Sequence, residues 1–185
     1  MNNYIRRPIR RPIYQSYMID NNIEVEPITE EILHQLLELQ DEVINQLIVK
    51  DLYRYTSYES YMEFIKSDAI IIGLYHEDTL IAFGALLKPF TYDPQLLDAD
   101  VFYDIDKSKV FYFRAVAIKK AYRGKGLHMF IVDYLEKEAI MLGGSHMIVN
   151  VHPDNEVSKN NFKKIWLSIL PWYISWISIF KKILF

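Results

Sequence analysis

A glycine-containing loop constrains the fold of this chain more than any other feature. The loop covers residues 121–128, and an apolar run of strand length, residues 110–118, stands before it. Behind it, apolar residues recur at helical spacing over residues 127–142, and Gly143 and Gly144 follow where a left-handed helix cap is expected. The sequence therefore predicts the order strand, glycine loop, helix.

The composition of this loop is typical of an anion-binding site. Gly124 and Gly126 have no Cβ, so the backbone can turn tightly and bring its N–H groups against a ligand. Those N–H groups lie at the positive end of the helix dipole, and Arg123 and Lys125 add charge beside them. We therefore expect the loop to hold phosphate.

The spacing of the loop selects among phosphate-binding motifs. A Walker loop needs Ser or Thr after its lysine, but Lys125 is followed by Gly126, and a dinucleotide fingerprint needs Gly where Met129 stands. The stretch resembles motif A of the GNAT acetyltransferase superfamily, Arg/Gln-x-x-Gly-x-Gly/Ala, which holds the pyrophosphate of acetyl-CoA. Arg123 and Gly126 fit this motif, whereas His128 stands where it has Gly or Ala. These eight residues alone fit an ordinary strand-to-helix turn equally well.

Length and charge place few limits on function. The 185 residues suit one domain, and 51% of them are hydrophobic. The total net charge is −3, and residues 1–19 carry four Arg and no acid, so the remainder carries −7. The absence of cysteine fits a reducing compartment, and no signal-peptide-like run is present, so we expect a cytoplasmic protein.

The first 19 residues form a separate segment. Residues 5–8, Ile-Arg-Arg-Pro, are repeated at residues 9–12, and proline at every fourth position prevents a stable helix. We interpret residues 1–19 as a flexible or extended arm. Four arginines could bind nucleic acid or anionic lipid. We instead expect the arm to dock on the acidic body of its own chain, and we expect no nucleic-acid partner.

Periodicity predicts the remaining elements. They are a strand over 22–27, helices beginning at Thr29 and Thr56, a hairpin of strands 69–75 and 80–87, a strand over 147–151 and a helix over 156–164. A hairpin followed by a right-handed β-α-β crossover predicts an α/β fold, with a central mixed sheet covered by helices on both faces.

Several local features carry their own predictions. Thr29 is expected to cap the first helix, and Thr56 with Glu59 to form a capping box for the second. Gly73 and Gly84 inside the hairpin strands indicate a bulge or a close contact. The tyrosines around the second helix either wall a substrate cleft or form core and rim; they are Tyr53, Tyr55, Tyr58 and Tyr61.

A long irregular connection over residues 88–109 is strongly acidic. It contains five Asp and no basic residue between positions 91 and 106. Such a loop near a cleft would favour a cationic acceptor such as an amine. A solvated loop that keeps the protein soluble is an equal alternative.

The whole order of elements from residue 20 to residue 164 is similar to the GNAT order. The resemblance implies a GNAT-like fold with a splayed parallel strand pair at the glycine loop. It also implies acetyl-CoA as cosubstrate, with strand backbone binding the pantetheine arm and an Asn after the fifth strand. The residues that the resemblance assigns to acetyl-CoA are Val116, Ala117, Ile118, Arg123, Gly124, Lys125, Gly126, Leu127, His128 and Asn155.

The implied activity is that of a transferase. A GNAT-type acyltransferase would move the acetyl group of acetyl-CoA to a small amine, an amino terminus or another peptide acceptor, as a monomer or homodimer. The alternative is a catalytically weak or inactive GNAT-like module that binds acetyl-CoA or acts through interactions.

Three departures from the family pattern bear on the chemistry. Phe162 stands where many members have a Tyr that protonates the departing thiolate of CoA, and Trp166-Leu167 replaces the usual Gly-Phe. Arg114 lies where some relatives have a carboxylate base. If Phe162 faces the sulfur, turnover should be slow and Phe162→Tyr should raise it. If Phe162 lies in the core, the tyrosine hydroxyl should destabilise the fold.

No spacing selects a catalytic base. His152 and His128 lie nearest the motif, and for each a structural role is the stronger interpretation. The five histidines show no metal-binding spacing, so we expect no metal.

The apolar C-terminal segment, residues 165–185, has three interpretations. It supplies the last strands of the sheet, it contacts a membrane interface, or a shift of reading frame has replaced the ancestral tail. Residues 165–180 carry no charge, but sixteen residues fall short of the roughly 20 needed to span a bilayer. Membrane contact by this segment is therefore not our first expectation.

Overall fold

The computed structural model describes residues 22–89, 105–165, 172–174 and 177–183. Within these ranges the strands form one seven-stranded sheet with the order β1-β2-β3-β4-β5-β7-β6. The strands are β1 (Ile23–Pro27), β2 (Ile70–His76), β3 (Thr79–Leu87), β4 (Val110–Ile118), β5 (His146–Val151), β6 (Trp172–Ile174) and β7 (Ile177–Ile183). The α-helices are α1 (Leu33–Asn45), α2 (Tyr58–Lys66), α3 (Leu127–Met141) and α4 (Glu156–Ile165). In the described ranges, short 3₁₀ turns join them: η1 (Glu30–Ile32), η2 (Lys50–Leu52), η5 (Lys107–Lys109) and η6 (Lys120–Tyr122).

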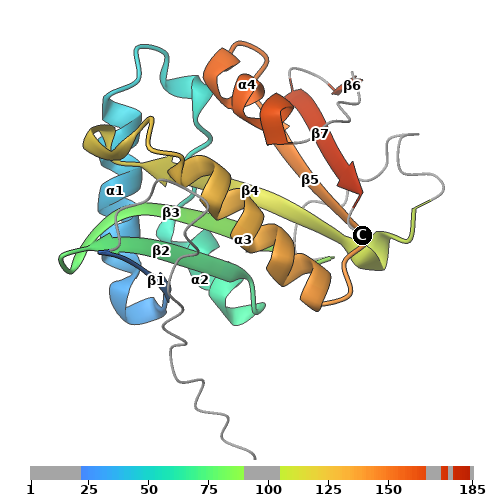
Figure 1. The fold of residues 1–185 in the computed structure, drawn as a ribbon, viewed down its shortest axis with the longest axis horizontal. Helices are drawn as coiled ribbons and strands as arrows, with labels where there is room; N and C mark the ends of the chain where they lie inside the picture. The colour runs from blue at the N-terminus through green and yellow to red at the C-terminus, as the bar shows by residue number, and fades with distance from the viewer. Residues whose placement is uncertain (1–21, 90–104, 166–171, 175–176, 184–185) are drawn as a thin grey trace, which may run out of the picture.

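The sheet is sandwiched between helices. Figure 1 shows α3 crossing one face and α1 with α2 lying behind the other. Two hydrophobic cores result. One joins α3 and Phe162 of α4 to the sheet, and the other joins α1 and α2 to β2, β3 and β4. The sheet is mixed, because β4 and β5 are parallel and the other pairs are antiparallel. The predicted fold class is therefore confirmed.

The predicted hairpin forms β2 and β3. Its turn residues Glu77 and Asp78 both have positive φ, 50° and 60°, which matches the right-handed twist of the flanking strands. Gly84 of β3 faces α3 so closely that a Cβ there would lie 2.2 Å from Cγ2 of Ile131. The predicted close contact at Gly84 is confirmed, and this glycine sets how near α3 packs to the sheet.

Two predicted helix caps are wrong in detail. Thr29 precedes η1 rather than α1, and its side chain makes no capping hydrogen bond. The cap of α2 is Ser57, whose Oγ accepts from the Ser60 N–H at 3.3 Å. Thr56 is instead buried, and its N–H donates to Oε1 of Gln40 at 3.2 Å. Thr56 thus bonds to Gln40, 16 residues earlier in the sequence, and the helix cap lies one residue later than predicted.

The parallel pair separates partway along its length. β4 pairs with β5 only over Val110–Phe113, opposite His146–Val149. Beyond Phe113, β4 continues to Ile118 paired only with β3, and β5 continues paired only with β7. Figure 1 shows the two strands diverging toward the start of α3. The splayed strand pair implied by the resemblance is confirmed.

The C-terminal segment contributes β6 and β7. β7 pairs antiparallel with β5 from His146↔Ile183 to Val151↔Ser178. These strands lie where the first of the three interpretations placed them. Within the described ranges, no helix is long and apolar enough to cross a membrane.

Two predictions concern residues outside the described ranges. The arm over residues 1–19 is one, and most of the acidic connection is the other. Of the five aspartates, Asp106 is described, and its Oδ1 accepts from the Ser108 N–H at 3.0 Å as the cap of η5.

Candidate functional site

The glycine loop has the geometry that an anion site needs. Gly124 and Gly126 both lie in the left-handed region, with φ of 76° and 82°. Gly126 is the N-cap of α3, and no side chain caps this helix end. A Cβ built on either glycine meets nothing within 4 Å, so open space adjoins the backbone here. A ligand can therefore approach the peptide groups directly.

The first turn of α3 offers donors to that space. The first helical hydrogen bond runs from the Phe130 N–H to the Gly126 carbonyl at 3.1 Å. The N–H groups that precede Phe130 consequently point out of the helix end, where they and the dipole favour a bound anion.

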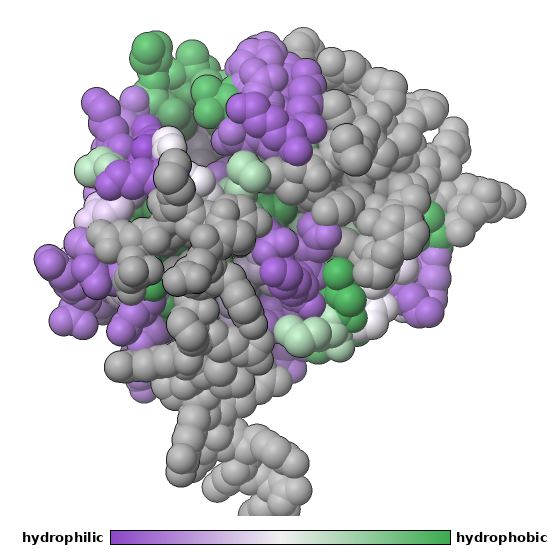
Figure 2. All heavy atoms as spheres, in the orientation of Figure 1, coloured by the Kyte–Doolittle hydropathy of each residue, from purple (hydrophilic) through white to green (hydrophobic). Residues whose placement is uncertain are grey.

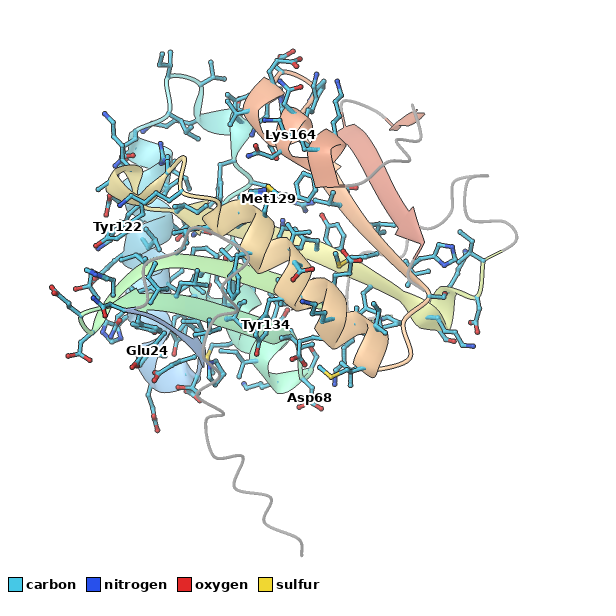
Figure 3. All side chains as sticks on the ribbon, in the orientation of Figure 1. Glu24, Asp68, Tyr122, Met129, Tyr134 and Lys164 are labelled. Carbon is cyan, nitrogen blue, oxygen red and sulfur yellow. The ribbon has the colours of Figure 1, made fainter. Side chains whose placement is uncertain are left out.

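Two side chains tie the loop to its surroundings. Nε of Arg123 donates to the Ile118 carbonyl at 3.0 Å, and Nη2 donates to Oε1 of Gln46 at 3.1 Å. Lys125 lies 5.0 Å from the centre of the Tyr122 ring, and the Tyr122 hydroxyl lies 3.2 Å from Nδ1 of His76. Tyr122 thus joins the loop to the end of the β2–β3 hairpin (Figure 3). These contacts attach the loop to the end of β4, to Gln46 and to the hairpin.

Beyond Phe113, β4 and β5 separate and leave a gap between them. The segment of β4 that faces this gap contains a bulge. Phe113 pairs with Leu86 and Ala115 with Ala85, so Arg114 is an inserted residue. Val116, Ala117 and Ile118 pair with β3 through one edge, and their other edge faces the gap left by β5. This open edge, next to the glycine loop, is where an extended ligand could hydrogen-bond to backbone.

Asn155 fixes the start of α4. Its Oδ1 accepts from the Ser158 N–H at 3.0 Å, so Asn155 caps this helix. Its Nδ2 donates to the Leu52 carbonyl at 3.0 Å. The amide therefore joins α4 to the connection between α1 and α2, across the open end of the gap.

That connection also carries an exposed apolar patch. Ile48 and Val49 are exposed beside the hydrophilic surface of α4, and the hydrophobic patch is visible above α1 in Figure 2. Because Gln46 accepts from Arg123, the connection lies beside the glycine loop. The open end of the gap therefore has an apolar border.

His128 and His152 lie in different environments. Both ring nitrogens of His128 are buried without a hydrogen-bond partner, and burial lowers its pKa to about 4. Its ring centre lies 5.0 Å from that of Phe162. Nδ1 of His152 accepts from the Asp154 N–H at 3.2 Å, and its side chain is partly exposed. The side chain of His128 is thus a neutral core group.

We expect the burial of His128 to make stability depend on pH. In the unfolded chain His128 takes up a proton below pH about 6.5, but the folded protein resists protonation down to about pH 4. Stability should fall as pH drops through this window, by roughly 3 kcal/mol in total. Urea denaturation at a series of pH values should show this loss, and His128→Phe should reduce it. An identical pH profile in the variant would contradict the assignment.

The sequence did not predict a group of polar residues around Arg114. Tyr53, Tyr61 and Tyr112 lie close enough to Arg114 for its charge to lower their pKa values, although burial raises each of them overall. Tyr61 is fully buried, and its hydroxyl donates to Oε1 of Gln40 at 3.4 Å. The cluster of tyrosines in the sequence was the only signal of this group, and for these tyrosines core and rim was the stronger interpretation and a substrate cleft the alternative.

Comparison with known proteins agrees with this geometry. No curated protein matches the sequence. Among solved structures, the GNAT domain of S. lividans PAT aligns with a TM-score of 0.68 and 14% identity over 88% of this chain and 90% of that one. The PaiA N-acetyltransferase from Thermoplasma acidophilum, solved with coenzyme A, aligns with a TM-score of 0.65 and 18% identity over 87% and 98%. An N-acetyltransferase from Staphylococcus aureus Mu50 gives 0.65 and 14% over 88% and 99%. The family model of the acetyltransferase (GNAT) family matches residues 33–165, and the chain belongs to this family.

Proposed function

We propose that this protein is an N-acetyltransferase that transfers the acetyl group of acetyl-CoA to a small amine or an amino terminus. Acetyl-CoA is the cosubstrate of the family. The observation that carries the proposal is the separation of β4 from β5 after Phe113, which leaves an open strand edge leading to a glycine loop at a helix N-terminus. The absence of cysteine supports action in a reducing compartment such as the cytoplasm.

The chain's own residues fit both parts of the donor. The pyrophosphate would lie on the backbone of Gly124, Lys125, Gly126 and Leu127, where left-handed glycines leave the peptide groups open. The pantetheine arm would run along the free edge of Val116, Ala117 and Ile118. Arg123 would act by maintaining the conformation of the loop, because its guanidinium already donates hydrogen bonds to Ile118 and Gln46. Asn155 would act by holding α4 at the gap.

Acetyl transfer needs a deprotonated amine, a partner for the developing oxyanion and a proton for the leaving thiolate. A backbone N–H near Ala117 or Ile118 would meet the oxyanion, because this strand edge is unpaired on the side of the gap. For the base, the buried, neutral ring of His128 is poorly placed, whereas the partly exposed His152 at the end of β5 remains a candidate. Proximity of the bound reactants supplies part of the acceleration in any case.

Phe162 does not face the open gap. Its ring is 1% exposed and packs edge-on against Phe113 and His128, with ring centres at 5.6 and 5.0 Å. Of the two cases considered for Phe162, this geometry fits the second, in which the residue lies in the core. A hydroxyl added there would enter a close-packed core that contains the buried ring of His128, and the extra volume would have to displace neighbouring atoms.

We accordingly expect Phe162→Tyr to destabilise the protein and to leave its turnover no faster. Overpacking of a core costs about 1–3 kcal/mol, and a buried hydroxyl that does not reach a ring nitrogen of His128 costs about as much again. Urea denaturation measures the loss, and release of CoA with saturating acetyl-CoA measures the turnover. A faster variant of unchanged stability would show instead that the ring does reach the thiolate.

Two measurements separate this function from that of a binding module. Calorimetric titration with acetyl-CoA decides whether the donor binds at all. Release of CoA over a panel of amines and short peptides then decides whether the protein transfers the group, and to what. Binding without release across the panel would support the module, and the lack of binding would reject both. The attraction of cationic acceptors by the acidic connection stays a prediction, because most of that connection lies outside the described residues.

A further inference from the structure

A positively charged residue stands at the point where the gap between β4 and β5 opens. Arg114 is the inserted residue of the β4 bulge, immediately after the last residue that pairs with β5. Bulges re-aim side chains, and they are frequent beside active sites. If the pyrophosphate lies on the glycine loop, the donor runs along β4 from Ile118 toward Arg114. The reacting end of the donor therefore lies nearest to Arg114.

The tyrosines place the Arg114 side chain on the face of the sheet that α1 and α2 cover. Its charge acts on Tyr53, Tyr61 and Tyr112, and Ala115, the next residue, belongs to the core on this face. Arg114 is partly exposed, so the group reaches the surface. We call Arg114, Tyr53, Tyr61, Tyr112 and Asn150 the Arg114 cluster.

In the part of the chain that the structure describes, no carboxylate forms an ion pair with Arg114, whose side chain instead shares a hydrogen bond with the Tyr112 hydroxyl. A second arginine, Arg54, also acts on the Tyr112 hydroxyl. The tyrosines do not neutralise this charge, because burial raises the pKa values of Tyr53 and Tyr112 and keeps both hydroxyls protonated. Among the described residues, an anionic group is the complement that this site lacks.

The cluster also contains buried polar atoms that are poorly satisfied. The Tyr53 hydroxyl, Oγ1 of the neighbouring Thr56 and both amide atoms of Asn150 form no hydrogen bond of ordinary geometry, although Tyr53 and Thr56 lie near the Tyr61 hydroxyl and Asn150 lies near that of Tyr112. Buried polar groups are nearly always paired, because leaving them unpaired is costly. Tyr53 and Asn150 come from the α1–α2 connection and from β5, so they lie on different sides of Arg114 on β4. A polar ligand among them would satisfy hydrogen bonds from several directions.

We propose that Arg114 binds a carboxylate of the acceptor, so that the acceptor is a zwitterion with an amine and a carboxylate, as in a free amino acid. A guanidinium binds a carboxylate through two parallel hydrogen bonds, which fixes orientation as well as affinity. Hydroxyl and amide donors of the cluster complete the carboxylate's shell. The carboxylate at Arg114 leaves the amine of the acceptor directed at the nearby thioester. This inference rests on the proposed acetyltransferase function and adds the class of its substrate.

Matched acceptors test the inference directly. CoA release is measured with free amino acids, with the corresponding amino acid amides and with aminophosphonates, each at saturating acetyl-CoA. We expect kcat/KM at least tenfold higher for the acids than for the amides. Equal or better use of the amides overturns the inference while leaving the acetyltransferase function intact. Preference for the aminophosphonates overturns the assignment of a carboxylate in favour of a phosphoryl group.

Variants of Arg114 locate the preference. Arg114→Gln should raise KM for the acids at least tenfold, with little change in their kcat or in either constant for the amides. Arg114→Lys should recover part of the loss, because it keeps the charge but not the bidentate geometry. Lys137→Gln removes the same charge from an exposed pair with Asp133 on α3, and should leave both KM values unchanged. Loss of activity toward acids and amides alike in both Arg114 variants would overturn the role in specificity.

A panel without any turnover is still decisive. Calorimetry of the CoA-loaded protein with N-acetylated amino acids and with their amides measures whether the carboxylate binds. Binding of the acids that Arg114→Gln abolishes supports the inference, and the absence of such binding overturns it. If acetyl-CoA itself does not bind, the proposed acetyltransferase function is rejected, and this inference with it.

Discussion

Gly126→Val should lower the affinity for acetyl-CoA by at least about 100-fold, beyond detection in a calorimetric titration. The residue lies at φ 82° and ψ 0°, a conformation that costs a non-glycine residue roughly 1–2 kcal/mol. More important, nothing occupies the space beside it, and two methyl groups there would fill the place where a phosphate must approach the N–H groups of α3. The loss should therefore be a loss of binding, seen in a protein that still folds.

Gly143→Val is the matched control for this experiment. Gly143 has φ of 80°, and a Cβ there also meets nothing within 4 Å, so its backbone strain is equivalent. It lies beyond the C-terminal end of α3, opposite the loop. Both variants should lose similar stability, and only the change at Gly126 should abolish binding. Gly126→Asn separates strain from blockage, because Asn tolerates the left-handed region and should still weaken binding. Unimpaired binding by Gly126→Val would exclude the loop as the phosphate site.

The elements that the sequence predicted well are those that local pattern determines. Nine residues rich in aromatic and β-branched side chains defined β4 at Val110–Ile118, the bounds found in the structure. The hairpin followed from two apolar runs separated by the polar residues 76–79, and Glu77 and Asp78 form its turn in the structure. The strand, glycine loop and helix were likewise predictable, since Gly143 ends the helix by a left-handed cap.

Features set by contacts between distant residues could not be predicted in this way. The bulge at Arg114 depends on the register of β4 against β3, which no local pattern of β4 contains. The shift of the α2 cap to Ser57 depends on Gln40, whose amide binds the backbone of Thr56 on both sides, at 2.9 and 3.2 Å. Gln40 is fully buried where it makes these two hydrogen bonds. The sequence does not reveal such a contact, because it forms only when α1 and the residues before α2 pack together.

The site shows the same division. The backbone groups implied by the resemblance lie along one strand edge and one loop, because they follow from the strand–loop–helix order. The roles of the side chains were harder to predict, because Arg123 and Asn155 contact residues distant in sequence, Gln46 and Leu52 respectively. The burial of His128 depends on Phe162 of α4. Side-chain roles thus depended on tertiary packing that spacing does not encode.

Gly84→Ala should cost about 3 kcal/mol or more in the free energy of unfolding, the largest stability effect that we expect from a single added methyl group. The new Cβ would lie 2.2 Å from Cγ2 of Ile131, where carbon atoms normally keep about 3.5–4.0 Å. Ile131 is fully buried and sits within α3, where a β-branched side chain has essentially one χ1 rotamer. The contact cannot be relieved by turning the side chain, so α3 must move away from β3. Because α3 begins at the glycine loop, affinity for acetyl-CoA should fall as well.

Two comparisons test this mechanism. Gly73→Ala also brings a Cβ within 2.7–2.8 Å of its neighbours, but these include the flexible ends of Leu80 and Ile28, so its cost should be smaller. Ile131→Leu moves the branch of this side chain from its Cβ to its Cγ at nearly constant volume. Alone, this substitution should lower the free energy of unfolding by less than about 1.5 kcal/mol. The double variant Gly84→Ala/Ile131→Leu should then regain much of the stability lost by Gly84→Ala, with a coupling energy of about 1–3 kcal/mol. Additive losses in this cycle, measured by urea denaturation, would show that α3 is not positioned by contact with Gly84.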